Sequence, residues 1–380
     1  MNVLITGGAG FIGSRLAKAL SAQNAHVTVL DTLSPQIHGA DAVFPDSLAA
    51  IVRCVQGDVC DSALMKDLLR DQDVVVHLAA ETGTGQSMYA VERYAQVNMQ
   101  GTAVLLDCIV NDRPQSLRKL VVASSRAVYG EGKYRCETHG VVFPAARTAS
   151  DMVAGRFEPL CPICENAVAP LATSEDTPFG PSSFYGLTKQ MQEQMVLLFA
   201  AALGLDGFAL RYQNVYGPGQ SLSNPYTGIL AIFSNLVRQG KPLNIFEDGK
   251  ESRDFVYIDD VVAATMACVA PDVHGVMALN VGSGERTSVM EVAQSIGAYF
   301  GASVPVNVTG DFRVGDIRHN YADIAKISAL AGYSPRWKFQ DGLQAFLSWA
   351  KFHETSDAGF DRSLDELKAR GLMRTGPARG

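Results

Sequence analysis

The sequence lacks both a long apolar run and an excess of positive charge. Its apolar stretches are too short to cross a bilayer. Its 32 lysines and arginines against 39 aspartates and glutamates give a formal net charge of −7. That balance argues against a nucleic-acid partner or a polybasic membrane surface. The chain begins on an expected strand, without the basic region, apolar segment and cleavage site of an export signal. We therefore expect a cytoplasmic protein with no membrane and no nucleic-acid partner.

Charged residues are also few, at 19% of the chain, against 47% apolar residues and 35 glycines. This is the composition of an ordinary soluble α/β enzyme, and 380 residues suffice for one large domain or two closely joined ones. In the cytoplasm, seven cysteines are thiols or metal ligands more readily than disulfides.

A glycine-rich turn at residues 7–13 follows the first expected strand, residues 2–6, and opens an Ala/Leu-rich helix. Its glycines allow a tight turn, close approach of the backbone to a pyrophosphate and tight helix packing, and the helix N-terminus faces the phosphates. Glycine-rich turns are common, but one between a strand and a helix predicts a dinucleotide site. The residues expected to contact the cofactor here are Gly7, Gly10, Phe11, Ile12 and Gly13.

Asp31 ends the second expected strand, residues 26–30. A carboxylate there can bind the adenosine ribose hydroxyls and would repel a 2′-phosphate, which favours NAD over NADP. A plain turn aspartate is the alternative. Further strands at residues 51–56 and 74–78 alternate with helices, which predicts a Rossmann-like, doubly wound parallel sheet. The other cofactor contacts that we expect are Asp58, Val59, Leu78, Ala79, Ala80 and Asn98.

Tyr185 and Lys189 lie four residues apart on an expected helix over residues 183–203. The spacing puts both on one helix face, and an ammonium beside a phenol favours the phenolate, which can act as a base near neutral pH. Ser125 follows a fifth strand, residues 120–123, at the ligand-binding edge of the sheet, where its hydroxyl could relay the proton. This combination suits oxidation of an alcohol by hydride transfer to a nicotinamide. A surface helix pair is the alternative for Tyr185 and Lys189.

Together these motifs resemble the extended short-chain dehydrogenase/reductase superfamily, in particular its nucleotide-sugar epimerases and dehydratases, from residue 1 to about 350. The resemblance implies that Ser125 is the active-site hydroxyl and that Tyr185 is the catalytic base and acid. Lys189 would hold the nicotinamide ribose and lower the tyrosine pKa. The resemblance also implies a homodimer formed through the helices at residues 86–110 and 183–203.

The later chain fits the same superfamily. Residues 211–218 resemble the segment whose asparagine, here Asn214, meets the nucleotide diphosphate. Arg253 and Arg313 lie in segments that resemble the phosphate-clamping ones, where a planar guanidinium binds phosphate oxygens bidentately. Taken singly, each could be an ordinary surface arginine. The substrate contacts that we expect are Ser125, Arg126, Asn214, Arg253 and Arg313.

The expected organisation follows from these segments. Residues 1–210 and 255–275 form the NAD-binding domain, and residues 211–254 and 276–350 form a smaller substrate lobe. Residues 354–380 are expected to form a peripheral tail with a short helix over residues 363–372.

One departure from the superfamily concerns the reaction. Its nucleotide-sugar 4,6-dehydratases carry an Asp-Glu pair directly after the active-site hydroxyl residue, whereas this chain has Arg126 and Ala127. Neither can perform the acid/base work of removing water. What remains is oxidation at one carbon and return of the hydride, which is epimerisation.

A second departure is an insertion, residues 131–178, between the serine strand and the tyrosine helix. Two short ligand pairs about twenty residues apart, Cys136 with His139 and Cys161 with Cys164, predict a Cys₃His zinc site. Four protein ligands leave no open position, so the metal would be structural and would hold a polar, proline-rich loop together. Zinc knuckles usually continue with glycine, and here Asn166 could take the left-handed turn. Unliganded thiols or a redox pair are the alternatives.

The insertion, with residues 85–89, 223–228 and 246–249, resembles the dTDP-L-rhamnose 4-epimerase subgroup, which makes dTDP-6-deoxy-L-talose. We therefore predict an NAD-dependent isomerase that acts on a nucleotide-diphosphate sugar. A 4-epimerase of UDP-glucose and UDP-galactose, or a non-catalytic NAD-binding sensor on the same fold, remain as alternatives.

Overall fold

A seven-stranded sheet organises the protein, in a computed structural model that describes residues 1–112, 114–222, 224, 228–301, 304–353 and 359–376. The strand order is β14-β9-β5-β4-β1-β2-β3, and every neighbouring pair is parallel. The order reverses beside β1, so the carboxyl ends of β1 and β4 flank the point at which such sheets bind ligands. The strands are β1 (Asn2–Thr6), β2 (His26–Asp31), β3 (Arg53–Gln56), β4 (Val74–His77), β5 (Lys119–Ser125), β9 (Asp206–Tyr212) and β14 (Val276–Val281).

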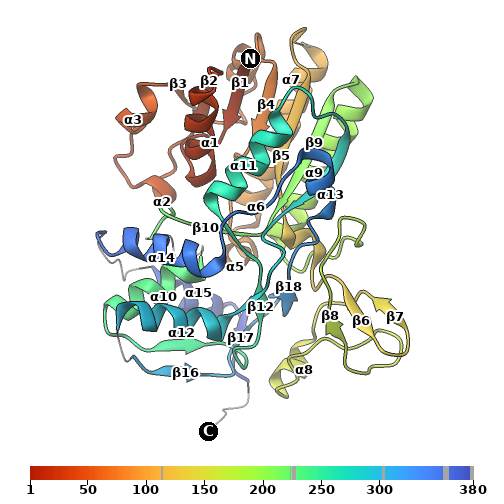
Figure 1. Ribbon diagram of the computed structural model, residues 1–380, viewed down its shortest axis with the longest axis vertical. Helices are drawn as coiled ribbons and strands as arrows, with labels where there is room; N and C mark the ends of the chain where they lie inside the picture. Colours follow the sequence, from red (N-terminus) through yellow and green to blue (C-terminus); the bar gives the residue numbers. More distant parts are fainter. Residues whose placement is uncertain (113, 223, 225–227, 302–303, 354–358, 377–380) are drawn as a thin grey trace.

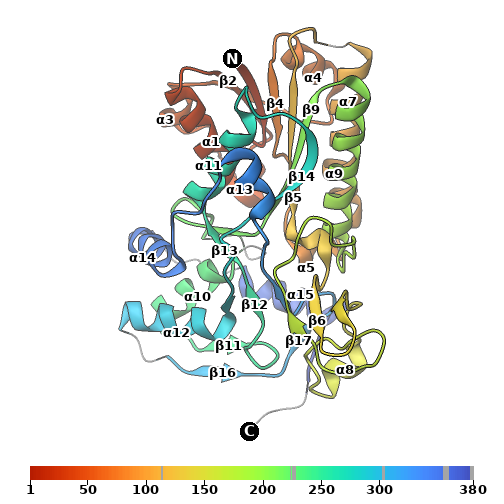
Figure 2. The ribbon, with the colours of Figure 1, turned by 45° about the vertical axis from the view of Figure 1, so that its right-hand side comes forward.

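Helices cover both faces of this sheet (Figures 1 and 2). Successive residues of β1 point to opposite faces, so Val3 and Ile5 pack in one apolar cluster and Leu4 packs in the other. The first cluster lies under α1 (Phe11–Ala22) and α11 (Ile258–Val269). The second lies under α4 (Ser62–Leu69), α7 (Gly101–Asn111) and α9 (Phe184–Leu203). The predicted doubly wound α/β class is thus confirmed.

β14 corrects the predicted division of the chain. Residues 276–281, which the sequence places in the substrate lobe, pair with β9 over six residues at the edge of the central sheet. Ala278, Leu279, Asn280 and Val281 are buried there. A strand that is buried on both faces has a short apolar sequence in whichever sheet it lies. The sequence therefore does not show which strand it pairs with, and only the fold does.

The second lobe packs below the carboxyl edge of the sheet, in the lower half of Figure 1. Its core includes an aromatic group in which Tyr216 contacts Phe255, Tyr257 and Phe339. Its helices are α10 (Ile229–Arg238), α12 (Val289–Phe300) and α14 (Phe339–Ala350), and α13 (Ala325–Ala331) packs back on β14. Its short strands are β10 (Asn214–Tyr216), β11 (Leu243–Ile245), β12 (Ser252–Arg253), β13 (Phe255–Tyr257), β15 (Thr287–Ser288), β16 (Val306–Val308), β17 (Phe312–Arg313) and β18 (His319–Asn320).

The insertion forms a small unit beside this lobe (Figures 1 and 2). It contains β6 (Tyr134–Cys136), β7 (Gly140–Val142), α8 (Ala149–Val153) and β8 (Ala169–Pro170), with β6 between the other two strands. The remaining short elements are α2 (Pro35–His38), α3 (Asp46–Ala49), α5 (Thr84–Ser87), α6 (Val91–Tyr94), the π-helix η1 (Ala95–Gln100) and the 3₁₀-helix η2 (Arg126–Tyr129).

The tail is packed more closely than its predicted peripheral place suggests. Its helix is α15 (Phe360–Ala369), a few residues earlier than predicted, and β19 (Met373–Arg374) pairs with β17. Tyr89 Oη donates a hydrogen bond of 2.7 Å to Glu366 Oε2. The tail therefore contacts both the loop after β4 and the strand that carries Arg313.

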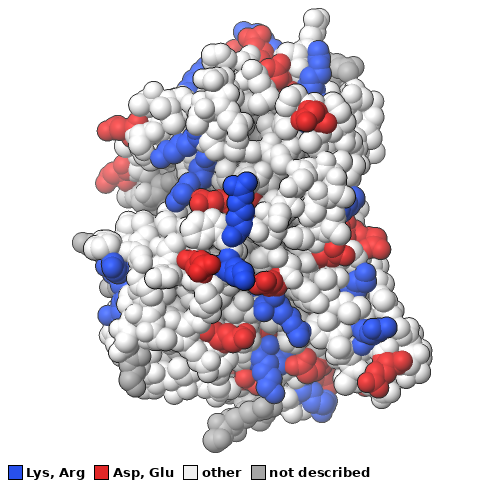
Figure 3. Space-filling view, viewed as in Figure 1, with Lys and Arg blue, Asp and Glu red and all other residues white. Residues whose placement is uncertain are grey.

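The surface agrees with the charge balance of the sequence. Figure 3 shows positive and negative side chains interspersed over one face, without a continuous basic patch there. Among the described residues, no helix combines the length and apolarity that a membrane span requires.

Candidate active site and a cysteine–histidine cluster

The glycine turn forms a cradle at the carboxyl end of β1. Gly7 has a φ of +69°, and a Cβ there would lie 2.8 Å from the backbone nitrogen of Ala79. A Cβ on Gly13 would lie 2.4 Å from the carbonyl oxygen of Gly7. Gly10 caps α1, whose first N–H groups point out of the helix N-terminus. The backbone geometry thus fits the predicted pyrophosphate cradle, because a side chain at 7 or 13 would clash with the backbone that shapes the turn.

Asp31 lies over this cradle at the end of β2. Its Oδ2 accepts a hydrogen bond of 3.0 Å from the backbone nitrogen of Ala9, and its Oδ1 accepts one of 2.9 Å from Leu33. Asp58 accepts from the backbone nitrogen of Cys60 at 2.8 Å. Both carboxylates follow strands at the same sheet edge, as an NAD site requires, and their contacts with the cofactor remain predictions.

Asn98 holds the loop after β4. Its side chain is fully buried, accepts from the backbone nitrogen of Glu81 at 2.7 Å and donates to the Glu81 carbonyl at 3.1 Å. It also donates to Thr188 Oγ1 of α9 at 3.0 Å. Asn98 lies in the π-helix η1, a feature that often marks functional sites. Asn98, which the sequence predicts as a cofactor contact, therefore also fixes the loop that contains Ala79 and Ala80.

Ser125, Tyr185 and Lys189 meet at the carboxyl end of β5. Ser183 caps α9 and accepts from the backbone nitrogen of Gly186 at 3.1 Å, which starts the helix just before Tyr185. The Ser125 side chain lies close enough to the Tyr185 hydroxyl to lower its pKa. Lys189 Nζ donates to the Ala123 carbonyl at 2.9 Å and lies 6.0 Å from the centre of the Tyr185 ring.

The electrostatics of this group differ from the sequence prediction. Burial raises the pKa of Tyr185, and the Ser125 hydrogen bond and the Arg126 charge oppose that rise without overcoming it. Burial also lowers the pKa of Lys189 to about 7, so its ammonium is only partly charged near neutral pH. Lys189 was predicted to lower the tyrosine pKa, but Ser125 and Arg126 are the residues that do so here.

Two arginines converge on the carboxylate of Asp316. Arg253 donates to Asp316 Oδ1 at 3.0 Å, and Arg313 Nη2 lies 3.5 Å from Asp316 Oδ2. The guanidinium of Arg313 also packs on the ring of Phe246. Burial would raise the pKa of Asp316, but the charges of Arg253, Arg313 and Arg126 lower it far below its usual range. The sequence alone assigned Asp316 no role. Its one signal was its place beside Gly315.

Among the described residues, the substrate candidates differ in how far their polar atoms are paired within the protein. A small pocket joins the loop after β4, the start of α9, the Arg313 segment and the tail. Within the described residues, Asn214 Oδ1 and Arg313 Nε are buried without a hydrogen-bond partner, as groups that await a polar ligand would be. Both terminal nitrogens of Arg253 already donate to protein oxygens. Of the predicted segment 223–228, residues 223 and 225–227 lie outside the described residues.

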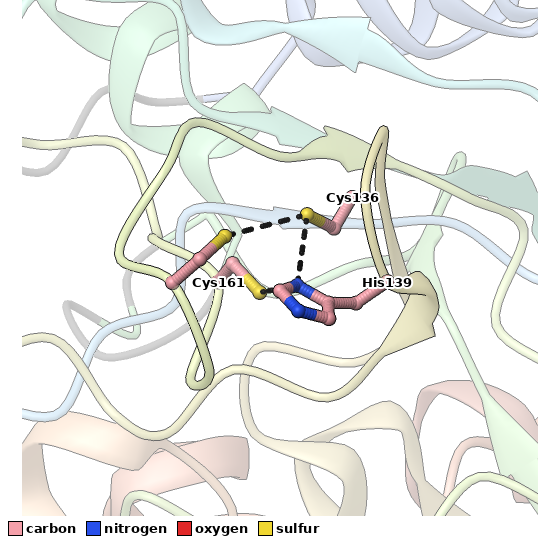
Figure 4. A group of neighbouring side chains, drawn as sticks. Cys136, His139 and Cys161 are labelled. Carbon is pink, nitrogen blue, oxygen red and sulfur yellow. Dashed lines mark hydrogen bonds between the residues drawn. The ribbon is translucent and has the colours of Figure 1, made fainter.

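The four metal-ligand candidates of the insertion come together (Figure 4). Their ligand atoms all lie within 4.8 Å of one another. Cys136 Sγ lies 3.7 Å from both Cys164 Sγ and His139 Nδ1, and Cys161 Sγ lies 3.6 Å from His139 Nδ1. The backbone N–H groups that follow Cys136 and Cys161 donate to their sulfurs. The left-handed residue after the second pair is Glu165, with a φ of +58°, and not Asn166.

Comparison with known proteins shows to which family the chain is similar. The model of the NAD dependent epimerase/dehydratase family matches residues 3–152 and 161–282. The chain belongs to the NAD-dependent epimerase/dehydratase family. A dTDP-L-rhamnose 4-epimerase of Burkholderia thailandensis is 40% identical over 349 residues, which cover 91% of this chain and 94% of that protein. A UDP-glucose 4-epimerase of Mycolicibacterium smegmatis is 30% identical over 349 residues, covering 90% and 96%.

Solved structures agree with these relatives. The UDP-glucuronic acid 4-epimerase of Bacillus cereus, in complex with UDP-glucuronic acid and NAD, superposes with a TM-score of 0.75 at 28% identity. The match covers 93% of this family member and 99% of that chain. The predicted family and enzyme class are thereby confirmed: this family member is an NAD-dependent nucleotide-sugar epimerase, an isomerase.

Proposed function

We propose that this epimerase interconverts dTDP-L-rhamnose and dTDP-6-deoxy-L-talose by inverting C4 through a 4-keto sugar. The observation that carries the proposal is the meeting of Ser125 and Tyr185 beside the glycine cradle, with Arg126 where a dehydratase has a carboxylate. The choice of sugar is supported by the relative with 40% identity over nearly the whole chain.

Tyr185 is the base and acid of this mechanism. As phenolate it takes the proton of the C4 hydroxyl, and the Ser125 hydroxyl, which lowers the Tyr185 pKa, would stabilise that charge. Bound NAD supplies the hydride acceptor and donor, so no net redox change appears. Residues 7–13, Asp31 and Lys189 would hold the cofactor. After the sugar has turned, Tyr185 returns the proton to the C4 oxygen, while the hydride returns to the other face of C4.

Inversion requires the sugar to present both faces while the nucleotide stays in place. Arg253 and Arg313 lie beside Asp316, within reach of one wall of the site, and arginines suit a diphosphate because of their planar donors. Anchored through its diphosphate, the 4-keto sugar turns about its phosphate linkage between the two hydride transfers.

The first experiment is an NMR-monitored incubation of purified protein with dTDP-L-rhamnose, UDP-glucose and UDP-galactose separately, without added NAD. We expect a C4 epimer from dTDP-L-rhamnose alone, and loss of turnover with retained NAD in Tyr185→Phe. Turnover of only the UDP sugars would refute the proposed substrate. A wild-type protein that binds NAD and turns over none of the three would favour a sensor.

We also propose that Cys136, His139, Cys161 and Cys164 bind one structural zinc ion. A tetrahedral ion with ordinary bond lengths separates two sulfurs by about 3.8 Å and a sulfur from an imidazole nitrogen by about 3.6 Å. The separations of 3.6 and 3.7 Å between these atoms match those edges. Backbone N–H groups that donate to two of the sulfurs would stabilise thiolates.

Metal analysis of protein purified without added metal tests this site. We expect about one zinc per chain in the wild type and in Cys60→Ser, whose thiol lies outside the cluster, and less than half of that in Cys161→Ser. Absence of metal from the wild type would refute the proposal. Oxidation of Cys161 and Cys164 to a disulfide in fresh protein would favour the redox alternative.

A homodimer in the cytoplasm completes the proposal. Leu187 and Leu198 of α9 are 41% and 66% exposed on the helix that the sequence predicts at the dimer interface. Light scattering should give twice the chain mass, and Leu198→Glu should shift it toward the monomer.

A further inference from the structure

One arginine of the insertion is buried against the substrate lobe. Arg147 has a side chain that is only 3% exposed, although it belongs to a loop outside the sheet. Its Nε donates to Glu131 Oε1 at 2.9 Å, and its Nη1 donates to Glu247 Oε2 at 2.8 Å and to the Phe157 carbonyl at 3.1 Å. Its Nη2 donates to the Asp316 carbonyl at 2.9 Å. A single side chain thus connects the insertion with the substrate lobe.

Arg147 cannot itself be an anion site. Two carboxylates, Glu131 and Glu247, already neutralise its guanidinium, and four of its five N–H groups donate to protein oxygens. Burial would lower the pKa of Arg147, but these two carboxylates more than offset it and raise that pKa. The role of this guanidinium is therefore to hold its neighbours in place.

The neighbour that matters is Asp316. Arg147 holds its carbonyl oxygen, while its carboxylate pairs with Arg253 and Arg313, the two arginines expected to bind the diphosphate. Arg253 and Arg313 together carry two positive charges against one carboxylate, and the Arg126 charge also acts on Asp316. This excess of positive charge beside Tyr185 favours an anionic ligand.

Further residues of the insertion contact the segment that follows Asp316. Glu158 accepts from Arg318 Nε at 2.9 Å and pairs with His319 Nε2 at 3.1 Å. The backbone nitrogen of Thr173 also donates to the Tyr321 carbonyl at 2.9 Å. Three residues of the insertion, spread over its length, therefore contact residues 316–321, directly after the strand that carries Arg313.

We propose that the insertion is a working part of the nucleotide-sugar site, in which Arg147 is a positioning residue that fixes Asp316 and, through it, the diphosphate arginines Arg253 and Arg313. This inference rests on the proposed function only in taking a nucleoside diphosphate as the ligand. Arg147 should thus control affinity for the diphosphate without taking part in proton or hydride transfer.

The test uses Arg147→Met and Arg147→Lys, with Arg156→Met as the matched control. Arg156 lies in the same insertion but is 62% exposed and pairs with Asp151 of the insertion itself. Lysine can still place a charge between Glu131 and Glu247, which preserves the fold, but one ammonium lacks the fork that also reaches the Asp316 carbonyl. Binding of dTDP and of UDP is measured by calorimetry, together with NAD content, unfolding temperature, KM and kcat.

We expect both Arg147 variants to raise the Kd of the nucleoside diphosphate, and the KM of any sugar turned over, by about 10- to 100-fold. NAD content should stay at the wild-type level, kcat should change by less than about twofold, and Arg156→Met should match the wild type. If the methionine variant does not fold, the lysine variant decides.

Two results would overturn the inference. One is a folded Arg147→Lys protein with wild-type Kd for dTDP and UDP. The other is a parallel loss of NAD, kcat and affinity, which would mean that Arg147 only supports the fold. Failure of the proposed function is distinguishable, because a wild type that binds dTDP or UDP but epimerises no sugar still allows the comparison of Kd values.

Discussion

Replacing Ser125 by alanine should raise the pKa of Tyr185, the proposed base, and slow the enzyme in a pH-dependent way. The Ser125 hydrogen bond and the Arg126 charge are the interactions that oppose the burial of Tyr185 and favour its phenolate. A hydrogen bond to a charged group is worth about 1.5–3 kcal/mol, and one pKa unit corresponds to about 1.4 kcal/mol. Removing the hydroxyl should therefore raise the tyrosine pKa by about one to two units.

The assay is the pH dependence of kcat/KM, which reports the ionisation of the free enzyme. In the wild type the rate should rise with pH as Tyr185 ionises. In Ser125→Ala that rise should move to higher pH by about one to two units, with a rate lower by about 10- to 100-fold on the acid side. NAD content should be unchanged.

Ser124→Ala is the matched control. The hydroxyl of the neighbouring Ser124 donates to Glu193 Oε2 of α9 at 2.6 Å and does not act on the Tyr185 pKa. Its loss should lower stability and leave the position of the pH profile unchanged. An unshifted profile in Ser125→Ala, or an equal shift in both variants, would refute the reasoning.

Three further predictions concern the supports of the site. Gly13→Ala should lower the unfolding free energy by about 1–3 kcal/mol and abolish NAD retention, because its Cβ would meet the Gly7 carbonyl at 2.4 Å; an alanine variant purified with full NAD would contradict this. Asn98→Ala should cost about 1–3 kcal/mol by urea unfolding and lower NAD affinity, because the Glu81 backbone loses both its partners; an unchanged NAD affinity would show that the loop is held by other contacts. Burial, and to a lesser extent the Lys189 charge, lowers the pKa of His77 to about 3, below its unfolded value of about 6.5. The unfolded state therefore binds the extra proton as pH falls through 6.5, and the stability advantage of the wild type over His77→Gln should shrink by about 2 kcal/mol between pH 7 and 5; a constant advantage would mean that His77 is not held neutral.

The sequence predicted the parts of the site that depend on local geometry. The glycines at 7, 10 and 13 lie between a strand and a helix, and the four-residue spacing of Tyr185 and Lys189 follows the helical repeat. The cysteine pairs were predictable for the same reason, because each pair sits within one short turn. These features involve neighbours in the chain, so no knowledge of the fold was needed.

Other features depend on contacts between distant segments. Arg313 is a neighbour of Asp316 in the sequence, but Arg253 and Arg147 reach Asp316 only in the folded chain, and nothing near Asp316 in the sequence indicates them. β14 joined the central sheet because β9 offered it an open edge.

The direction of the Tyr185 pKa shift likewise required the structure. The sequence identified a phenol beside an ammonium, which by itself lowers the phenol pKa. Burial decides the balance, and it depends on everything that packs around α9. Local spacing thus predicted which residues carry the chemistry, whereas the tertiary structure decided their charge states and their supports, because desolvation and long-range ion pairs arise only when the chain folds.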